Sequence, residues 1–73
     1  MIYVNKKQSY NKGFALLEEA YEKGSIEGTR LLGLCYKAGI GCKKSRSKAK
    51  ALLKKAADKG DEEAKAELSK FRF

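Results

Sequence analysis

Two stretches of the chain, SYNKGFALLEEAYEKGSIEGTRLLG (residues 9–33) and SRSKAKALLKKAADKGDEEAKAELS (residues 45–69), align without a gap when the sequence is shifted by 36 residues. A period of this length is typical of helix-turn-helix units that stack into a solenoid. The sequence therefore predicts a helical repeat protein. The two copies carry the same residue at these pairs of positions: Ser9/Ser45, Lys12/Lys48, Ala15/Ala51, Leu16/Leu52, Leu17/Leu53, Ala20/Ala56, Lys23/Lys59, Gly24/Gly60, Glu27/Glu63 and Leu32/Leu68.

Each copy carries the signals of two helices. Ser9 and Ser45 are predicted N-caps, and Gly24 and Gly60 occupy positions where a left-handed residue ends a helix. The second copy places five apolar residues on one helical stripe, namely Ala49, Leu52, Leu53, Ala56 and Ala57. We therefore predict an all-α fold, an α-α superhelix of four antiparallel helices at residues 9–24, 25–39, 45–60 and 61–71.

The composition describes one small globular domain that takes up residues 1–73. Hydrophobic residues make up 42% of the chain and charged residues 36%, which is typical of a folded chain and not of a disordered one. No stretch approaches the roughly 18 apolar residues of a membrane span, and the first residues lack the apolar segment of a secretory signal. We expect a cytoplasmic protein without a membrane partner.

Cys35 and Cys42 stand close to a Gly-x-Gly turn in a chain without histidine. They lack the spacing and the further ligands of a zinc site, so we predict no metal and interpret both as apolar core positions, with a disulfide as the alternative. A phosphate loop needs a Lys-Ser/Thr pair at a fixed distance that opens a helix after a strand. No strand is expected before the turn at residues 39–41, so we interpret it as a bend between helices. The carboxylates have the spacing of solvated helix faces, and we predict no catalytic residue and no cofactor.

The repeat resembles the Sel1-like repeat family, a branch of the tetratricopeptide-like helical repeats. Its pattern is roughly A-x3-L-G-x-[ML]-Y-x2-G-x-G-V-x2-D-x2-K-A-x2-W-x2-K-A-A-x2-G. Departures from it are Gly28 for alanine, Cys35 for an apolar residue, Cys42 for valine, Ser45 for aspartate and Leu52 for the aromatic residue. The residues that stand at the family's positions are Gly28, Leu32, Gly33, Cys35, Tyr36, Gly39, Gly41, Cys42, Ser45, Lys48, Ala49, Leu52, Lys55, Ala56, Ala57 and Gly60, after which the pattern restarts at Ala64 and Leu68.

The resemblance implies that the chain lacks the leading helix of its first repeat. The helix at residues 9–24 would then have an uncovered face, and we expect the N-terminal segment, residues 1–8, to fold back on it as a lid over Phe14 and Tyr21. Solenoids usually need about three repeats for stability, so self-association is a further expectation. The resemblance also implies a non-catalytic module for protein interaction.

The net charge of +8 comes from the middle of the chain. Residues 34–60 hold nine basic side chains and a single acidic one, whereas the segments before and after them are close to neutral. Like charges four residues apart on a helix are unfavourable by a few tenths of a kcal/mol, and nothing structural requires them here. A solubilising face and a surface for an acidic partner are both consistent with this pattern.

We predict a non-enzymatic adaptor or small regulator that binds an acidic protein surface through a basic helix and loop. The alternative is a small accessory protein that binds nucleic acid or nucleoprotein, although no aromatic residue is interleaved with these lysines and base stacking is therefore poorly supported. The predicted partner-binding residues, which include an apolar pair beside the basic groups, are Arg30, Leu31, Leu34, Lys37, Lys43, Lys44, Arg46, Lys50 and Lys54.

Overall fold

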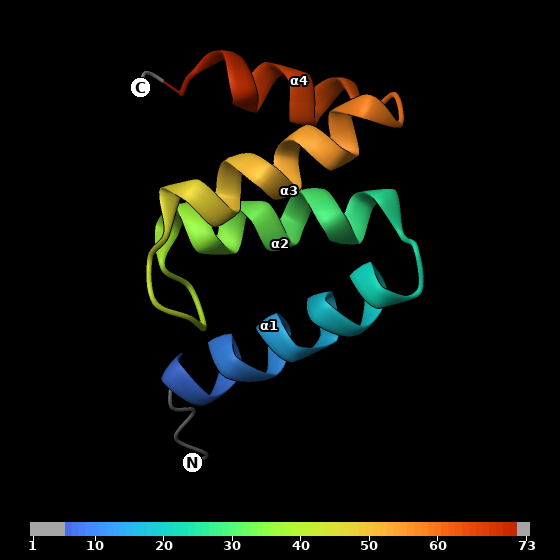
Figure 1. Ribbon diagram of the computed structural model, residues 1–73. Coiled ribbons are helices and arrows are strands. Elements are labelled where there is room, and N and C mark those ends of the chain that lie inside the picture. The colour runs from blue at the N-terminus through green and yellow to red at the C-terminus, as the bar shows by residue number, and fades with distance from the viewer. Residues whose placement is uncertain (1–5, 72–73) are drawn as a thin grey trace.

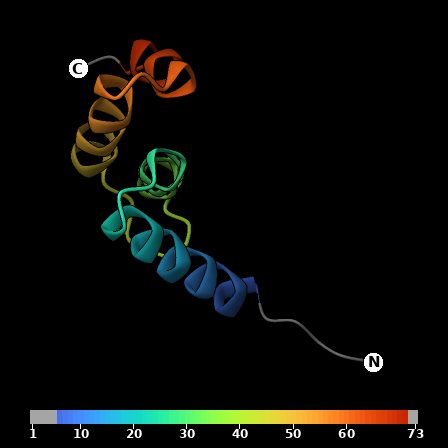
Figure 2. The same ribbon diagram turned by 90° about the vertical axis from the view of Figure 1, so that its right-hand side faces the viewer.

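The computed structural model describes residues 6–71 and confirms the all-α fold (Figure 1). Four helices follow one another as a stack, with the first and the last at opposite ends, and the stack curves along its length (Figure 2). The helices are α1 (Lys6–Glu22), α2 (Ile26–Ala38), α3 (Arg46–Asp58) and α4 (Glu62–Ser69). The helices α1 and α3 are equivalent in the 36-residue repeat, as are α2 and α4.

Three of the four helices begin at a capping side chain. Ser25 Oγ accepts a hydrogen bond from the amide of Gly28 at 2.9 Å, Ser45 Oγ accepts one from Lys48 at 3.3 Å, and Asp61 caps α4. The predicted cap at Ser45 is therefore confirmed. Gly24 and Gly60 have positive φ after α1 and α3, as predicted for residues that end a helix.

The predicted cap at Ser9 is wrong, because α1 begins at Lys6 and runs through that position. The residues before Gly13 include neither glycine nor proline, so nothing in them prevents another helical turn N-terminal to the serine. Of the predicted lid at residues 1–8, the last three residues belong to α1. The rest of that lid lies outside the described residues.

The centre of the core is α3. All five apolar residues that the sequence places on its inner stripe are buried, and Leu53 is the largest of them with no exposed surface. From α4, Ala64 completes this cluster, and Leu34, Leu68 and Phe71 pack against it. The stripe of α3 thus joins the helices on either side of it, and the prediction of that stripe is confirmed.

The helix α1 is covered on one side only. Its Phe14 meets Tyr36 of α2 edge to face, with ring centroids 5.4 Å apart. Tyr21 accepts a hydrogen bond from Lys55 of α3 at 2.7 Å. Both aromatic rings thus contact helices that follow α1 in the chain, and the lid over them stays a prediction, because most of its residues lie outside the described part of the chain. The uncovered side is marked instead by Leu16, which is 67% exposed.

The loop between α2 and α3 is fixed to the helices at both of its ends. Gly41 has φ +74°, and a Cβ added there would lie 2.5 Å from the carbonyl oxygen of Tyr10 in α1. Only glycine allows both the backbone conformation and this close approach. At the other end, the amide of Ser45 donates a hydrogen bond to the Tyr36 carbonyl at 2.9 Å. The predicted bend is thus a packed loop.

Candidate protein-docking surface

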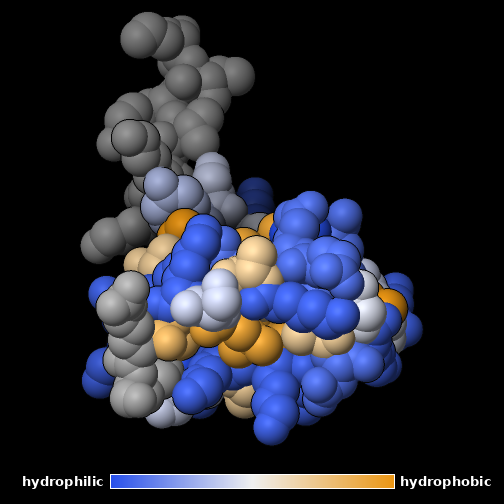
Figure 3. All heavy atoms as spheres, turned by 90° about the horizontal axis from the view of Figure 1, so that it is seen from above, coloured by the Kyte–Doolittle hydropathy of each residue, from blue (hydrophilic) through white to orange (hydrophobic). Residues whose placement is uncertain are grey.

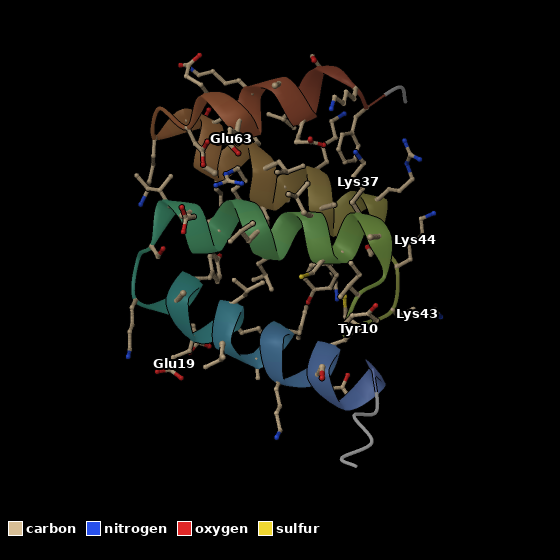
Figure 4. All side chains as sticks on the ribbon, turned by 180° about the vertical axis from the view of Figure 1, so that it is seen from behind. Tyr10, Glu19, Lys37, Lys43, Lys44 and Glu63 are labelled. Carbon is tan, nitrogen blue, oxygen red and sulfur yellow. The ribbon has the colours of Figure 1, made fainter. Side chains whose placement is uncertain are left out.

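The loop and α3 expose a group of basic side chains. Lys43 and Lys44 lie in the loop and point away from the body of the molecule (Figure 4). On α3, Lys50 and Lys54 share the outer stripe with Ser47 and Ala51, and these four residues line a shallow hollow of about 410 Å³. Arg46, at the start of α3, is also exposed. We call Lys43, Lys44, Arg46, Lys50 and Lys54 the basic face.

Arg30 belongs to the interface between α2 and α4 and not to this face. Its guanidinium Nε lies 3.0 Å from Asp61 Oδ2 and its Nη1 lies 3.1 Å from Glu63 Oε2, and the arginine side chain is only 13% exposed. Glu63 lies on the side of α4 that faces α2 (Figure 4). Burial alone would raise the pKa of Asp61, but the amide of Ala64 and the Arg30 guanidinium together lower it below its usual value.

Lys37 joins the same two helices at their other end. Its Nζ lies 2.9 Å from Glu67 Oε1 and 5.6 Å from the centroid of the Phe71 ring. The hydrogen bond from Lys37 lowers the pKa of Glu67 below its usual value, although burial acts in the opposite direction. The structure thus gives two of the predicted binding residues, Arg30 and Lys37, a role inside the chain.

The predicted apolar pair is not an exposed anchor. Leu34 packs against the core cluster around Leu53, so its side chain stabilises the fold. Leu31 is half-buried, and neither leucine is among the exposed large apolar residues.

Arg46 lies with its guanidinium carbon 5.4 Å from the Phe71 ring centroid, so the first residue of α3 is close to the end of α4.

A groove between α1 and α3 holds residues that sequence reasoning did not select. It has a volume of about 270 Å³ and its walls carry opposite charges. Lys48 Nζ lies 5.4 Å from the Tyr36 ring centroid and Lys55 Nζ lies 5.3 Å from that of Tyr21. These pairs are distant in the sequence, so local spacing could not reveal them. The lining residues are Glu18, Tyr21, Glu22, Leu32, Tyr36, Lys48, Ala51 and Leu52.

The two cysteines are half-buried and unbridged. The Cys42 thiol lies 3.6 Å from the carbonyl oxygen of Cys35 and donates a weak hydrogen bond to it. Burial raises the pKa of both thiols, and at Cys42 this effect prevails over the opposing charge of Lys48. Thiols with raised pKa values are poor nucleophiles near neutral pH. Their expected position in the core is therefore only partly correct.

The described part of the chain contains neither a metal-binding cluster nor a membrane-spanning helix. Between residues 6 and 71, no group of three or more cysteine, aspartate or glutamate side chains is placed to hold a metal ion. Within the same range, no helix has both the length and the apolar character needed to cross a bilayer.

The helical repeat agrees with a comparison against known families. The Sel1 repeat model matches residues 5–25 and 26–61, which is more than half of the chain, and the boundary between the two matches falls at the start of α2. The chain belongs to the Sel1 repeat family, whose repeats are generally non-catalytic and mediate protein-protein interaction. No curated protein and no solved structure matches the chain.

Proposed function

We propose that this protein is an adaptor that docks an acidic protein surface on its basic face. The observation that carries the proposal is the concentration of exposed basic side chains on that face, in a stretch of sequence between Glu27 and Asp58 that contains no acidic residue. All five side chains of the face are exposed. Between residues 6 and 71, Lys43, Lys44 and Lys54 take part in no ion pair. Their positive charges are therefore available to a partner.

The position of the loop lysines supports the same proposal. Lys43 and Lys44 immediately precede the N-terminus of α3, where the helix dipole is positive and basic groups are unfavourable by about 0.3–1 kcal/mol each. An acidic partner removes this unfavourable term and gains from both the lysines and the helix end. The structure thus favours an anionic group at the start of α3, with Lys50 and Lys54 extending the contact along the helix.

The test is binding of a fluorescent acidic peptide, rich in glutamate and aspartate, followed by fluorescence anisotropy. We expect the double variant Lys43→Glu, Lys44→Glu and the double variant Lys50→Glu, Lys54→Glu each to raise the Kd by about tenfold or more. The matched control is Lys12→Glu with Lys59→Glu, which removes the same charge from exposed positions outside the face. Equal Kd values for all three variants would show that only the net charge matters and would contradict a defined face.

A labelled RNA strand of the same length distinguishes the two classes of partner. The placement of Lys48 and Lys55 over tyrosine rings is an aromatic arrangement that the linear sequence did not show, and it favours testing nucleic acid as the second candidate. Tighter binding of RNA than of the acidic peptide, with a steep loss of affinity between about 50 and 200 mM salt, would support that candidate. Capture from cells with and without nuclease gives the same distinction for native partners.

A further inference from the structure

We propose that this protein stacks head to tail on further copies of itself, with α4 of one copy packed on the uncovered side of α1 in the next. This surface is separate from the basic face, and the inference goes beyond the proposed function. It rests on a comparison of two junctions: the one between α2 and α3, which the chain contains, and the equivalent one between α4 and a second α1.

The uncovered side of α1 is marked by two positions that are buried one repeat later. Leu16 is 67% exposed, whereas its equivalent Leu52 is 9% exposed. Gly13 has no atom within 4 Å of the place where a Cβ would stand, whereas its equivalent Ala49 is completely buried. Glu19, on the same side of α1, points away from α2 (Figure 4). The face that is buried in α3 is therefore exposed in α1, its equivalent in the first repeat.

In α3 these positions are covered by α2. A Cβ placed on Gly33 would lie 3.2 Å from the Ala49 carbonyl oxygen and 3.3 Å from Leu52 Cβ, so the two helices approach closely at that glycine. The helix that is equivalent to α2 is α4, and no helix of the described chain follows it. Figure 3 looks onto this end of the molecule and shows apolar side chains as narrow strips between hydrophilic ones. The open side of α4 therefore corresponds to the surface that α2 uses to cover α3.

The sizes of the side chains match across the proposed junction. Where α2 has Gly33 against Ala49 of α3, α4 offers Ser69 against Gly13 of the second α1. In both junctions one of the two facing residues is glycine, in α2 within the chain and in α1 at the proposed junction. The two helices can therefore approach each other equally closely. The apolar pair is retained as well, because Leu32 and Leu52, which line the same groove, are replaced by Leu68 and Leu16. Leu68 is half-buried against the core cluster of its own chain, so it offers only its remaining exposed surface.

The charges also match. Thr29 of α2 lies in one hollow with Lys55 and Asp58 of α3. At the proposed junction the equivalent residues are Lys65 of α4 and Glu19 and Glu22 of α1, so a lysine meets two glutamates. Within one chain Glu19 pairs with Lys23 and Lys65 pairs with Glu62, but these side chains are all more than half exposed. Such surface pairs stabilise little and can exchange partners at low cost.

Because the proposed contact joins two different surfaces, every stack of copies keeps an unused α1 surface at one end and an unused α4 surface at the other. Association of this type continues into open filaments unless the rotation between copies closes a ring. A symmetric dimer through α1 alone would use only one of the two surfaces. This difference provides the test.

The experiment is sedimentation velocity on the full chain between about 10 µM and 1 mM, a range suited to weak association. The weight-average mass of the unmodified protein should rise above 8.1 kDa with concentration. Leu16→Lys blocks the α1 surface and Ser69→Arg blocks the α4 surface. Both residues are exposed, so the variants should fold, as circular dichroism will verify. We expect each variant alone to lose at least about tenfold in association constant, since each places a charge in an apolar contact.

An equal mixture of the two variants is the decisive sample, because the intact α4 of Leu16→Lys can pack on the intact α1 of Ser69→Arg. The mixture should form dimers and nothing larger. A monomeric unmodified protein up to 1 mM, unchanged association of either variant, or a mixture that does not associate would each overturn the proposal. Undiminished dimer formation by the Ser69→Arg variant alone would also overturn it, because such dimers would use α1 of both copies in a symmetric contact. The charge exchange Glu19→Lys with Lys65→Glu in one chain should restore the association that Glu19→Lys weakens.

Discussion

Arg30 of α2 and Asp61 at the N-cap of α4 form an ion pair of 3.0 Å between two side chains that are 13% and 12% exposed. Asp61 also accepts hydrogen bonds from the amides of Glu63 and Ala64. One carboxylate therefore both starts the last helix and holds it against the second. Glu63 pairs with Arg30 and Glu67 pairs with Lys37 across the same two helices, so the position of α4 depends on three ionised acids.

Acidification should therefore destabilise the protein. The pKa values of Asp61 and Glu67 are lower in the folded chain than their ordinary values of 3.8 and 4.5. The unfolded chain then binds protons first as the pH falls, so the stability that both groups contribute is complete above about pH 5 and is lost progressively below it. Urea unfolding at several pH values measures this loss.

The variant Asp61→Asn separates charge from capping, because asparagine is an equally good N-cap. It should be less stable than the unmodified protein at pH 7 and should show a smaller decrease in stability on acidification. Glu62→Gln is the control, since the Glu62 side chain is 83% exposed and should change little. If Asp61→Asn and Glu62→Gln gave the same pH dependence, the ion pair would not be the cause.

Equivalent leucines of the two repeats should differ in their contribution to stability. Leu53→Ala removes a completely buried side chain and should lower the free energy of unfolding by about 2–5 kcal/mol. Leu16→Ala removes one that is 67% exposed and should change it by less than about 0.5 kcal/mol. Thermal or urea unfolding of dilute protein compares them, and a large loss for Leu16→Ala would show that its side is covered within a single chain.

Two helical glycines should respond in opposite ways to alanine. Gly13→Ala meets no atom within 4 Å and should stabilise the protein by about 0.5–1 kcal/mol, because alanine favours the helix. Gly28→Ala places its Cβ 2.7 Å from Ala20 Cβ, so α1 and α2 must move apart and the protein should be less stable. The difference in melting temperature between the two variants checks both signs, and a stabilised Gly28→Ala would contradict the close approach of these helices.

The two thiols should react slowly with an alkylating reagent at pH 7. Their pKa values are raised by burial, so the fraction present as thiolate is smaller than in an ordinary cysteine. Adding urea should bring both thiols to the rate of a free cysteine, and mass spectrometry counts the modified groups. Rapid alkylation of the folded protein would contradict this environment.

The repeat made the helices and the α3 core predictable from the sequence, because a buried stripe needs only local spacing. The same spacing could not locate the partners of Arg30 and Lys37, since the carboxylates that bind them lie about thirty positions later. From the sequence, Arg30 and Lys37 are expected on a charged surface. In the structure they form ion pairs between α2 and α4, because α4 lies beside α2.

The candidate site was predictable only in part for the same reason. Lys43, Lys44, Lys50 and Lys54 were correctly expected to be exposed, because the loop and the outer stripe of α3 follow from the repeat. The contacts of Lys55 with Tyr21 and of Lys48 with Tyr36 depend on how α1 and α2 pack beside α3. The open side of α1 could not be predicted from the sequence either. Phe14 and Tyr21 suggested that their own side is uncovered, whereas in the structure they contact α2 and α3 and Leu16 is exposed.

The packed loop between α2 and α3 has a consequence for the entropy of binding. Mobile loops that order on contact with a partner lose conformational freedom at that moment, and the lost freedom weakens affinity. Here Gly41 is seated on α1 and the amide of Ser45 is bonded to Tyr36 before any partner arrives. The backbone beneath Lys43 and Lys44 has thus already been ordered by folding, and a partner that docks on the proposed basic face would need to immobilise only the lysine side chains.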